Sequence, residues 1–274
     1  MLPVRLTSFA QTRDTQRGTV VILASGPSAR GFPLAECPYP VIAVNGSVLM
    51  FEGLSVKPFY YLCDDVNFAK SKADVLVKGI VGAEHVALSD LCFMEAESKG
   101  AAFPQNKPYF LLERVNRMND RAPLTDRRFA WSIRHDQELH SDFSLWRRKP
   151  NRIGFSRNFV KGYFCARTIA YVGVQLACHL GFSRVCLVGV DLNPKAGRSY
   201  QEHVALPSTL DEDFEDYILP SFRFLRQHII RPGRFEVFNL SPDSRLPAGL
   251  IPRLGLDELF VPALEGQQGI GGCL

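Results

Sequence analysis

Six short apolar segments, each four to six residues long, recur along the chain between stretches long enough for a helix or a loop. They are residues 20–23, 40–44, 58–63, 85–88, 184–188 and 235–240. Continuous apolar runs of this length are typical of strands buried on both faces, and strands that alternate with helices form parallel sheets with right-handed crossovers. The pattern therefore predicts an α/β fold: one Rossmann-like domain over residues 1–274, a parallel sheet flanked by helices.

Two helices are expected in the second half of the chain. Residues 162–180 carry apolar side chains at helical spacing, and Gly181 is expected to end this helix. Residues 213–230 show a second amphipathic pattern, which Pro220 is expected to break.

The composition, 46% hydrophobic and 22% charged residues, is that of an ordinary globular protein. No apolar run approaches the roughly 18 residues of a membrane-spanning helix, and residues 1–15 lack the order of a signal peptide. We therefore expect a cytoplasmic location. The seven cysteines are odd in number, scattered and without a C-x-x-C pair, so we expect reduced thiols. No spacing of His, Cys and Asp suggests a metal site, so neither a metal nor another cofactor is expected.

Basic residues are concentrated between Arg114 and Arg167, with aromatic residues among them. Residues 105–151 show no clear periodicity, so we interpret them as an insertion or lid within the domain. Arg beside aromatic residues favours an anionic partner, such as a phosphorylated glycan or the anionic inner membrane, which the protein would contact peripherally. A merely solvated insertion is the alternative. Because no nucleic-acid-binding motif is present, nucleic acid is not an expected partner.

The first apolar segment stops in a turn made of Ser25, Gly26, Pro27 and Ser28. A glycine at such a turn lets the backbone approach a ligand closely, and Ser28 is expected to cap the helix that follows. Free backbone N–H groups at a strand-to-helix turn attract phosphate. The turn therefore predicts a nucleotide phosphate site, although a Gly-Pro turn is also ordinary punctuation in α/β proteins.

Small polar residues follow the other strands too. Asn45-Gly46 follows the second segment and Asp64-Asp65 the third, while Gly189-Val190-Asp191 and the Ser241 to Ser244 turn follow the last two. Because ligands of parallel α/β sheets bind outside the carboxyl ends of the strands, we expect these residues to line one site. Each turn alone has an alternative explanation, since these residue types dominate turns for backbone reasons.

Taken in order, these motifs resemble the bacterial sialyltransferases that decorate lipooligosaccharide. Ala24 to Ser28 is similar to the G-N-G-P-S of that family, and the segment from Lys161-Gly162 to Gly189-Val190-Asp191-Leu192-Asn193 is similar to its S-G helix followed by S-G-I-D-F-Y. The turn from Ser241 to Ser244 is similar to its C-P-N-S. The chain departs from the family at Ser25 (Asn in the family), Lys161 (Ser) and Asn193 (Tyr), and no histidine stands at the family's catalytic spacing.

The resemblance implies a metal-independent glycosyltransferase that moves a 2-keto-3-deoxy acid, either sialic acid or the eight-carbon acid Kdo, from its CMP donor to a glycan or glycolipid acceptor. It also implies that the chain can form a homo-oligomer. The implied donor-binding residues are Ser25, Gly26, Pro27, Ser28, Asn45, Asp64, Lys161, Gly162, Gly189, Asp191, Asn193, Ser241 and Ser244.

For the catalytic groups, His203 is the hypothesised general base, with Glu202 as a rival, because histidine titrates near neutral pH and His203 follows the Asp191 strand end. Tyr200 is expected to hydrogen-bond the departing phosphate.

Two other functions stay open from the residues alone. A pyrophosphokinase of the same fold would need carboxylates for Mg²⁺, which Asp64, Asp65 and Asp191 can supply. A non-catalytic nucleotide-binding module is the second alternative, because the family's catalytic Tyr and His are not matched in place.

Overall fold

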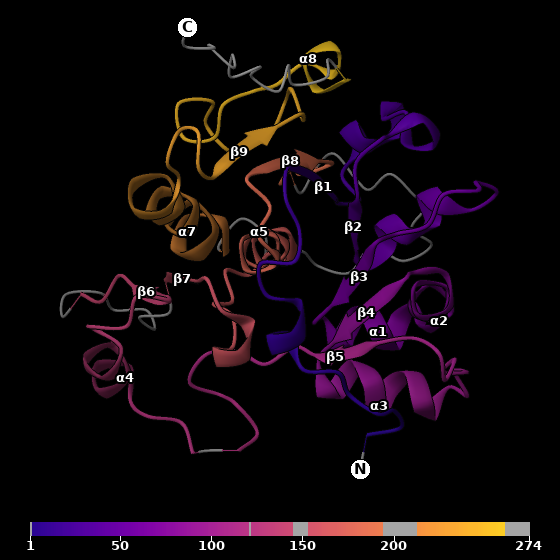
Figure 1. The fold of residues 1–274 in the computed structure, drawn as a ribbon, viewed down its shortest axis with the longest axis horizontal. Helices are drawn as coiled ribbons and strands as arrows, with labels where there is room; N and C mark the ends of the chain where they lie inside the picture. Colours follow the sequence, from indigo (N-terminus) through magenta and orange to yellow (C-terminus); the bar gives the residue numbers. More distant parts are fainter. Residues whose placement is uncertain (1, 121, 145–152, 194–212, 261–274) are drawn as a thin grey trace, which may run out of the picture.

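A seven-stranded, entirely parallel sheet forms the centre of the computed structural model, which describes residues 2–120, 122–144, 153–193 and 213–260 (Figure 1). The strand order is β5-β4-β3-β2-β1-β8-β9. The strands are β1 (Thr19–Leu23), β2 (Val41–Val44), β3 (Tyr60–Cys63), β4 (His85–Leu88), β5 (Tyr109–Leu111), β8 (Arg184–Val188) and β9 (Glu236–Asn239). All six predicted strands are confirmed, each to within two residues at either end.

The order of the strands reverses on either side of β1. Val21 pairs with Val41 of β2 on one side and with Cys186 of β8 on the other. Sheets of this kind bind ligands where the order reverses, in the crevice outside the carboxyl ends of the two strands. A ligand site is therefore expected at the residues that follow β1 and β8.

Each face of the sheet is covered by its own group of helices. Val20 and Ile22 of β1 pack into the same core cluster as α5 (Ile169–Leu180), whereas Val21 and Leu23 face the opposite cluster. This second cluster includes residues of α1 (Val66–Ser71), α2 (Ala73–Gly82) and α3 (Asp90–Ser98). Figure 1 shows these three helices on one side of the molecule, with α5 and α7 on the other.

Helix α5 begins later than the expected residue 162. Residues Phe159–Lys161 form a separate 3-10 turn (η5), and Gly162 and Arg167 have φ angles of +87° and +58°, which an α-helix does not allow. The apolar residues of this stretch belong to a buried loop, and their spacing in the sequence resembles that of a helix. The expected end is confirmed, because Gly181 caps α5 in the left-handed conformation.

The helix over residues 214–229 runs through Pro220, contrary to the expectation that this proline breaks it. A π-helical turn, η6 (Phe214–Ile218), leads into α7 (Leu219–Phe224) and then into a second one, η7 (Leu225–Ile229). Pro220 stands in the first turn of α7, directly after the wider turn. Pro220 has no N–H to donate, and it lies where the hydrogen-bonding pattern changes from that of η6 to that of α7.

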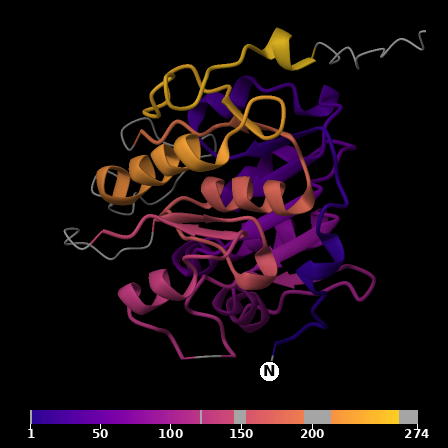
Figure 2. The same cartoon turned by 60° about the vertical axis from the view of Figure 1, so that its left-hand side comes forward.

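The expected insertion over residues 105–151 contains the edge strand β5, so the part that leaves the sheet begins only after this strand. Three residues are too few for a periodicity to be visible. The part beyond β5 includes α4 (Asp126–Ser132) and β6 (Leu139–Ser141), which pairs antiparallel with β7 (Gly154–Ser156). Figure 2 shows α4 and this hairpin on the same side of the molecule as α5 and α7.

Short elements complete the described chain. They are η1 (Phe9–Thr12), η2 (Pro27–Gly31), η3 (Leu34–Glu36), η4 (Asn45–Phe51) and α8 (Leu256–Phe260). Within the described ranges, we find no helix with both the length and the apolar character needed to cross a membrane.

Candidate functional site

The ends of β1 and β8 lie in direct contact at the point where the strand order reverses. The Gly26 N–H donates to the Gly189 carbonyl at 2.9 Å. A Cβ on Gly26 would lie 2.4 Å from both this carbonyl oxygen and Asp191 Oδ2, and a Cβ on Gly189, whose φ is +71°, would lie 2.4 Å from the Ala24 carbonyl oxygen. Both glycines are therefore required by the approach of one strand end to the other, a reason the sequence alone does not give.

Asp191 joins the same two strand ends through its side chain. Its Oδ2 accepts the backbone N–H of Ser28 at 2.9 Å and its Oδ1 accepts the Ser28 hydroxyl at 2.5 Å. Asp191 is only 6% exposed. The Asp191 carboxylate thus caps the first turn of η2, whereas Ser28 was expected to be the cap itself; the N-cap position is Gly26. The Ser28 N–H that was expected to hold phosphate is used by Asp191.

The turn after β9 contacts both of these strand ends through Ser241 and Ser244. Ser241 Oγ lies 2.7 Å from Ser28 Oγ and accepts the Val190 N–H at 3.0 Å, while Ser244 Oγ donates to the Val190 carbonyl at 2.6 Å. Ser241 is completely buried. The structure thus brings together six predicted residues from three strand ends, which we call the Ser28–Asp191 cluster: Gly26, Ser28, Gly189, Asp191, Ser241 and Ser244.

Asn45 stands at the end of the neighbouring strand, β2, with a φ of +47°. Its Oδ1 is buried and accepts no hydrogen bond within the described part of the chain. An unsatisfied buried acceptor costs about 1–3 kcal/mol. This oxygen is therefore in a state to accept a hydrogen bond from a bound molecule, which supports the prediction that Asn45 contacts the donor.

Asp64, after β3, is held by two residues that the sequence analysis missed. Its Oδ2 accepts Arg114 Nε at 3.0 Å and Nη2 at 2.7 Å, and the Tyr163 hydroxyl donates to the same oxygen. Burial, followed by the charge of Asp64, raises the pKa of Tyr163 well above its ordinary value, so this hydroxyl stays protonated and donates. Arg114 was missed because β5, which ends three residues earlier, was not recognised as a strand.

Lys161 and Gly162 are placed apart from the Ser28–Asp191 cluster. Lys161 Nζ lies 2.6 Å from Asp136 Oδ2 and 2.8 Å from Glu138 Oε2. Gly162 packs on the backbone after β5, where an added Cβ would lie 2.9 Å from the Glu113 carbonyl oxygen. The ammonium group of this predicted donor-binding residue is therefore already engaged by two carboxylates.

The start of α5, a candidate position for a phosphate, lies seven residues after Gly162, where the sequence analysis expected the helix to begin. Because α5 leads through a short turn into the amino end of β8, its own first turn lies toward the carboxyl ends of the strands. The Thr168 side chain at its N-cap makes no capping hydrogen bond, and Arg167, just before it, is about half exposed (54%) and lies 3.6 Å from Asp213. Helix starts with free N–H groups bind anions.

The remaining predicted residues are only partly described. Ser25 and Pro27 lie within the first turn, half-buried, and Asn193 is exposed at the end of a described range. His203, Tyr200 and Glu202 lie outside the described residues. Within the described residues, no cluster of three His, Cys, Asp or Glu side chains could hold a metal ion.

A parallel α/β sheet with polar residues at the strand ends beside its reversal point is typical of the Rossmann-like class, to which many nucleotide-binding proteins belong. Residues 6–256 match the family of the 3-deoxy-D-manno-octulosonic acid transferase WaaZ, and the chain belongs to this family. The chain is 28% identical over 241 residues to the probable 3-deoxy-manno-octulosonic acid transferase of Salmonella typhimurium, covering 87% of each chain. It is 27% identical over 247 residues to the probable enzyme of Escherichia coli, covering 88% of this chain and 83% of that one.

The chain also resembles solved structures of glycosyltransferases. The MAf glycosyltransferase from Magnetospirillum magneticum aligns with a TM-score of 0.51 and 14% identity, over 95% of this chain and 37% of that one, which supports the fold. The sialyltransferase CstII from Campylobacter jejuni aligns with a TM-score of 0.46 and 15% identity, over 89% of each chain.

The family match confirms the resemblance to CMP-sugar transferases that move sialic acid or Kdo. The chain is a sialyltransferase-like glycosyltransferase of bacterial lipopolysaccharide biosynthesis, of the group that transfers Kdo or sialic acid. The pyrophosphokinase and the non-catalytic module are thereby set aside.

Proposed function

We propose that this enzyme transfers Kdo, rather than sialic acid, from CMP-Kdo to a sugar of a lipopolysaccharide acceptor. The observation that carries the choice of donor sugar is the match of residues 6–256 to a family of Kdo transferases. The two relatives carry the same activity in their names, over more than four fifths of this chain.

In the proposed reaction, an acceptor hydroxyl oxygen attacks C2 of Kdo while the bond from C2 to the phosphate oxygen breaks. CMP leaves with the electron pair, and a general base takes the hydroxyl proton. The first turn of α5, with Thr168 and Arg167, is suited to the phosphate, because N–H groups and a cation stabilise the developing charge. Asn45 Oδ1, a buried acceptor without a partner among the described residues, is suited to a donor group of the nucleotide.

The test is donor choice by the purified full-length chain. CMP release is measured with CMP-Kdo and with CMP-sialic acid, each with and without lipopolysaccharide from a strain that lacks this enzyme. We expect acceptor-dependent release from CMP-Kdo and at least a hundredfold slower release from CMP-sialic acid. Faster release from CMP-sialic acid would overturn the proposed donor.

Metal independence is tested in the same assay. Because protein donors and a helix start can stabilise the leaving phosphate, transfer should persist in excess EDTA. Loss of transfer in EDTA that Mg²⁺ restores would contradict this part of the proposal.

His203 is the proposed general base. Replacing His203 with Ala should leave stabilisation by CMP unchanged and lower transfer by about two orders of magnitude. Glu202→Gln is the matched variant, because Glu202 is the rival base. Normal turnover in the His203 variant together with a large loss in the Glu202 variant would transfer the role to Glu202.

Peripheral contact with an anionic inner membrane and assembly into homo-oligomers stay predictions. Flotation with phosphatidylglycerol vesicles tests the first, and sedimentation equilibrium tests the second.

A further inference from the structure

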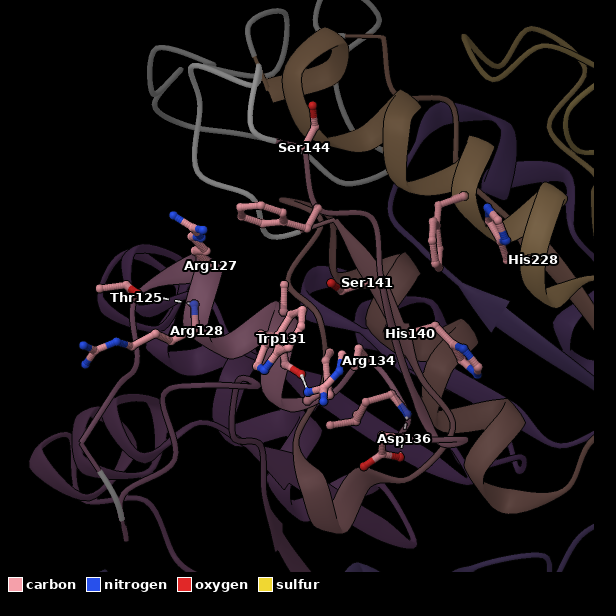
Figure 3. Close-up of a pocket in the computed structure, with 15 residues that line it drawn as sticks. Thr125, Arg127, Arg128, Trp131, Arg134, Asp136, His140, Ser141, Ser144 and His228 are labelled. Atoms are coloured by element: carbon pink, nitrogen blue, oxygen red, sulfur yellow. Dashed lines mark hydrogen bonds between the residues drawn. The ribbon is translucent and has the colours of Figure 1, made fainter.

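A cavity of about 1300 Å³ lies mainly in the part of the chain that follows β5 (Figure 3). It is bounded by α4, by β6 and the residues on either side of it, and by Phe224 and His228 of the α7–η7 helix. None of the residues that line it belongs to the Ser28–Asp191 cluster. Its volume exceeds the roughly 300–1,000 Å³ of most small-ligand sites, so it can hold more than one sugar unit.

The cavity is lined by an excess of positive charge. Arg127, Arg128 and Arg134 come from α4 and the turn after it. Asp136 is the carboxylate among the described lining residues, and its Oδ2 already lies 2.6 Å from Lys161 Nζ. No carboxylate of the described chain forms an ion pair with the guanidinium of Arg127 or Arg128. A ligand that matches this lining carries negative charge.

An exposed aromatic ring stands among these cations. Trp131 is 68% exposed, and the guanidinium carbon of Arg134 lies 3.9 Å from the centre of its ring. Arg134 Nη1 also donates to the Trp131 carbonyl at 2.7 Å, which fixes the pair. Arg127 lies four residues before Trp131 and therefore on the same face of α4. Figure 3 shows His140 and His228 across the cavity from this face.

This combination is suited to a charged carbohydrate. The C–H faces of a sugar ring are apolar and stack on an indole ring, while a guanidinium binds a carboxylate or a phosphate through two parallel hydrogen bonds. A lipid bilayer is a flat surface, whereas this site is concave and lined partly by side chains on opposite walls. The observations therefore favour a saccharide over a membrane surface.

We propose that this cavity is a binding subsite for the acidic sugar portion of the acceptor, a saccharide that carries a carboxylate or a phosphate. The inference rests on the proposed function in one respect, because it takes the bound saccharide to be the acceptor. Trp131 would stack on the sugar, and Arg127 and Arg134 would bind its anionic group.

The experiment measures binding separately from transfer. The chain has two tryptophans, so a Trp146→Phe background leaves Trp131 as the single indole reporter. The probe is the methyl glycoside of Kdo, a carboxylate, and the matched probe is its methyl ester, which has no charge. CMP is present in excess. We expect the acid to change Trp131 fluorescence saturably and the ester to bind at least tenfold more weakly.

Variants locate the site. Arg127→Gln and Arg134→Gln should each weaken binding of the acidic glycoside by about tenfold or more, since each removes a charged hydrogen-bond donor. Arg234→Gln is the control, because Arg234 is an exposed arginine outside the cavity. It removes the same charge and should leave binding unchanged.

Several results would overturn the proposal. Equal binding of acid and ester would exclude recognition of the anionic group, and equal weakening by Arg234→Gln would reduce the effect to net charge. Binding to phosphatidylglycerol vesicles but not to the glycoside, lost in the same variants, would assign the surface to the membrane. In transfer assays, Arg127→Gln should raise the KM for acceptor and leave the KM for CMP-Kdo unchanged. If the unaltered chain binds the glycoside yet transfers no Kdo, the proposed function fails while the subsite stands.

Discussion

The two oxygens of the Asp191 carboxylate hold the backbone N–H and the hydroxyl of Ser28, at 2.9 and 2.5 Å. The two residues are 163 positions apart in the chain and follow β1 and β8, the strands between which the order of the sheet reverses. The pair therefore fixes the two walls of the proposed donor crevice relative to each other.

Removal of the Asp191 carboxylate should destabilise the fold. In Asp191→Ala, the half-buried Ser28 N–H loses its acceptor and the Ser28 hydroxyl keeps only Ser241 Oγ as a partner, so the free energy of unfolding should fall by about 1–3 kcal/mol in urea titrations. Glu97→Ala is the control, because Glu97 is an exposed acid and surface changes of this kind stay within about 0.5 kcal/mol. Equal stability of the two variants would show that the Asp191 contacts contribute nothing.

Gly26 should not tolerate a side chain. An added Cβ would lie 2.4 Å from Asp191 Oδ2 and from the Gly189 carbonyl oxygen, so Gly26→Ala must push the two strand ends apart, at a cost of about 1–3 kcal/mol. It should also abolish thermal stabilisation by CMP if the crevice holds the nucleotide. Gly31→Ala is matched to it, since Gly31 ends the same short helix and nothing lies within 4 Å of its added Cβ. A normal CMP response in the Gly26 variant would move the nucleotide away from this turn.

The main strands could be predicted from the sequence, because a strand buried on both faces needs a continuous apolar run whatever its neighbours are. Short elements could not. Strand β5 has three residues, and β6 and β7 have three each, so no periodicity distinguishes them from a loop. The start of α5 was missed for a different reason: tertiary burial of the loop before it gives apolar residues without a helix.

The set of strand-end residues could also be predicted, but not their partners. That Ser28 and Asp191 belong to one edge follows from parallel strands, whereas their direct contact depends on β1 and β8 being neighbours. Likewise, Asp64 was predicted as a donor-binding residue. Its hydrogen bonds to Arg114 and Tyr163 could not be predicted, because they depend on where β5 and the loop before α5 lie. Local sequence carries no information on such long-range pairs.

The ion pairs of Lys161 with Asp136 and Glu138 should make the stability of the fold depend on pH in the acid range. Hydrogen bonds from Lys161 and then Asn158 lower the pKa of Glu138 from 4.5 to about 2. A carboxyl group with a lowered folded-state pKa stabilises the protein above its unfolded pKa, and this stabilisation is lost as the pH falls from about 4.5 to 2. Urea unfolding of Glu138→Gln should therefore show a shallower loss of stability across this range than the unaltered chain.

The control for the acid range is Glu97→Gln, which removes an exposed carboxyl group outside the Lys161 ion pairs and should leave the slope unchanged. Identical slopes for Glu138→Gln and the unaltered chain would mean that the ion pairs of Lys161 do not contribute to stability in solution.

Replacing Asn45 should lower CMP affinity without lowering the stability of the free protein, which distinguishes a binding role from a structural one. Its Oδ1 is buried without a partner in the described chain, so removing it should cost the free protein little, whereas a bound nucleotide would lose a hydrogen bond. Asn45→Gly keeps a residue that accepts the φ of +47°, and we expect stability within about 1 kcal/mol of the unaltered chain and CMP affinity lowered about tenfold by calorimetry. Asn116→Gly is the matched variant: Asn116 also has a positive φ, +59°, but its side chain bonds to Leu124. This second change should lower stability and leave CMP affinity alone, because Asn116 lies in the segment after β5 and not at the end of a sheet strand. If the two variants bound CMP equally well, Asn45 would have no part in the donor site. Its Oδ1 would then accept a hydrogen bond from a water molecule and not from the nucleotide.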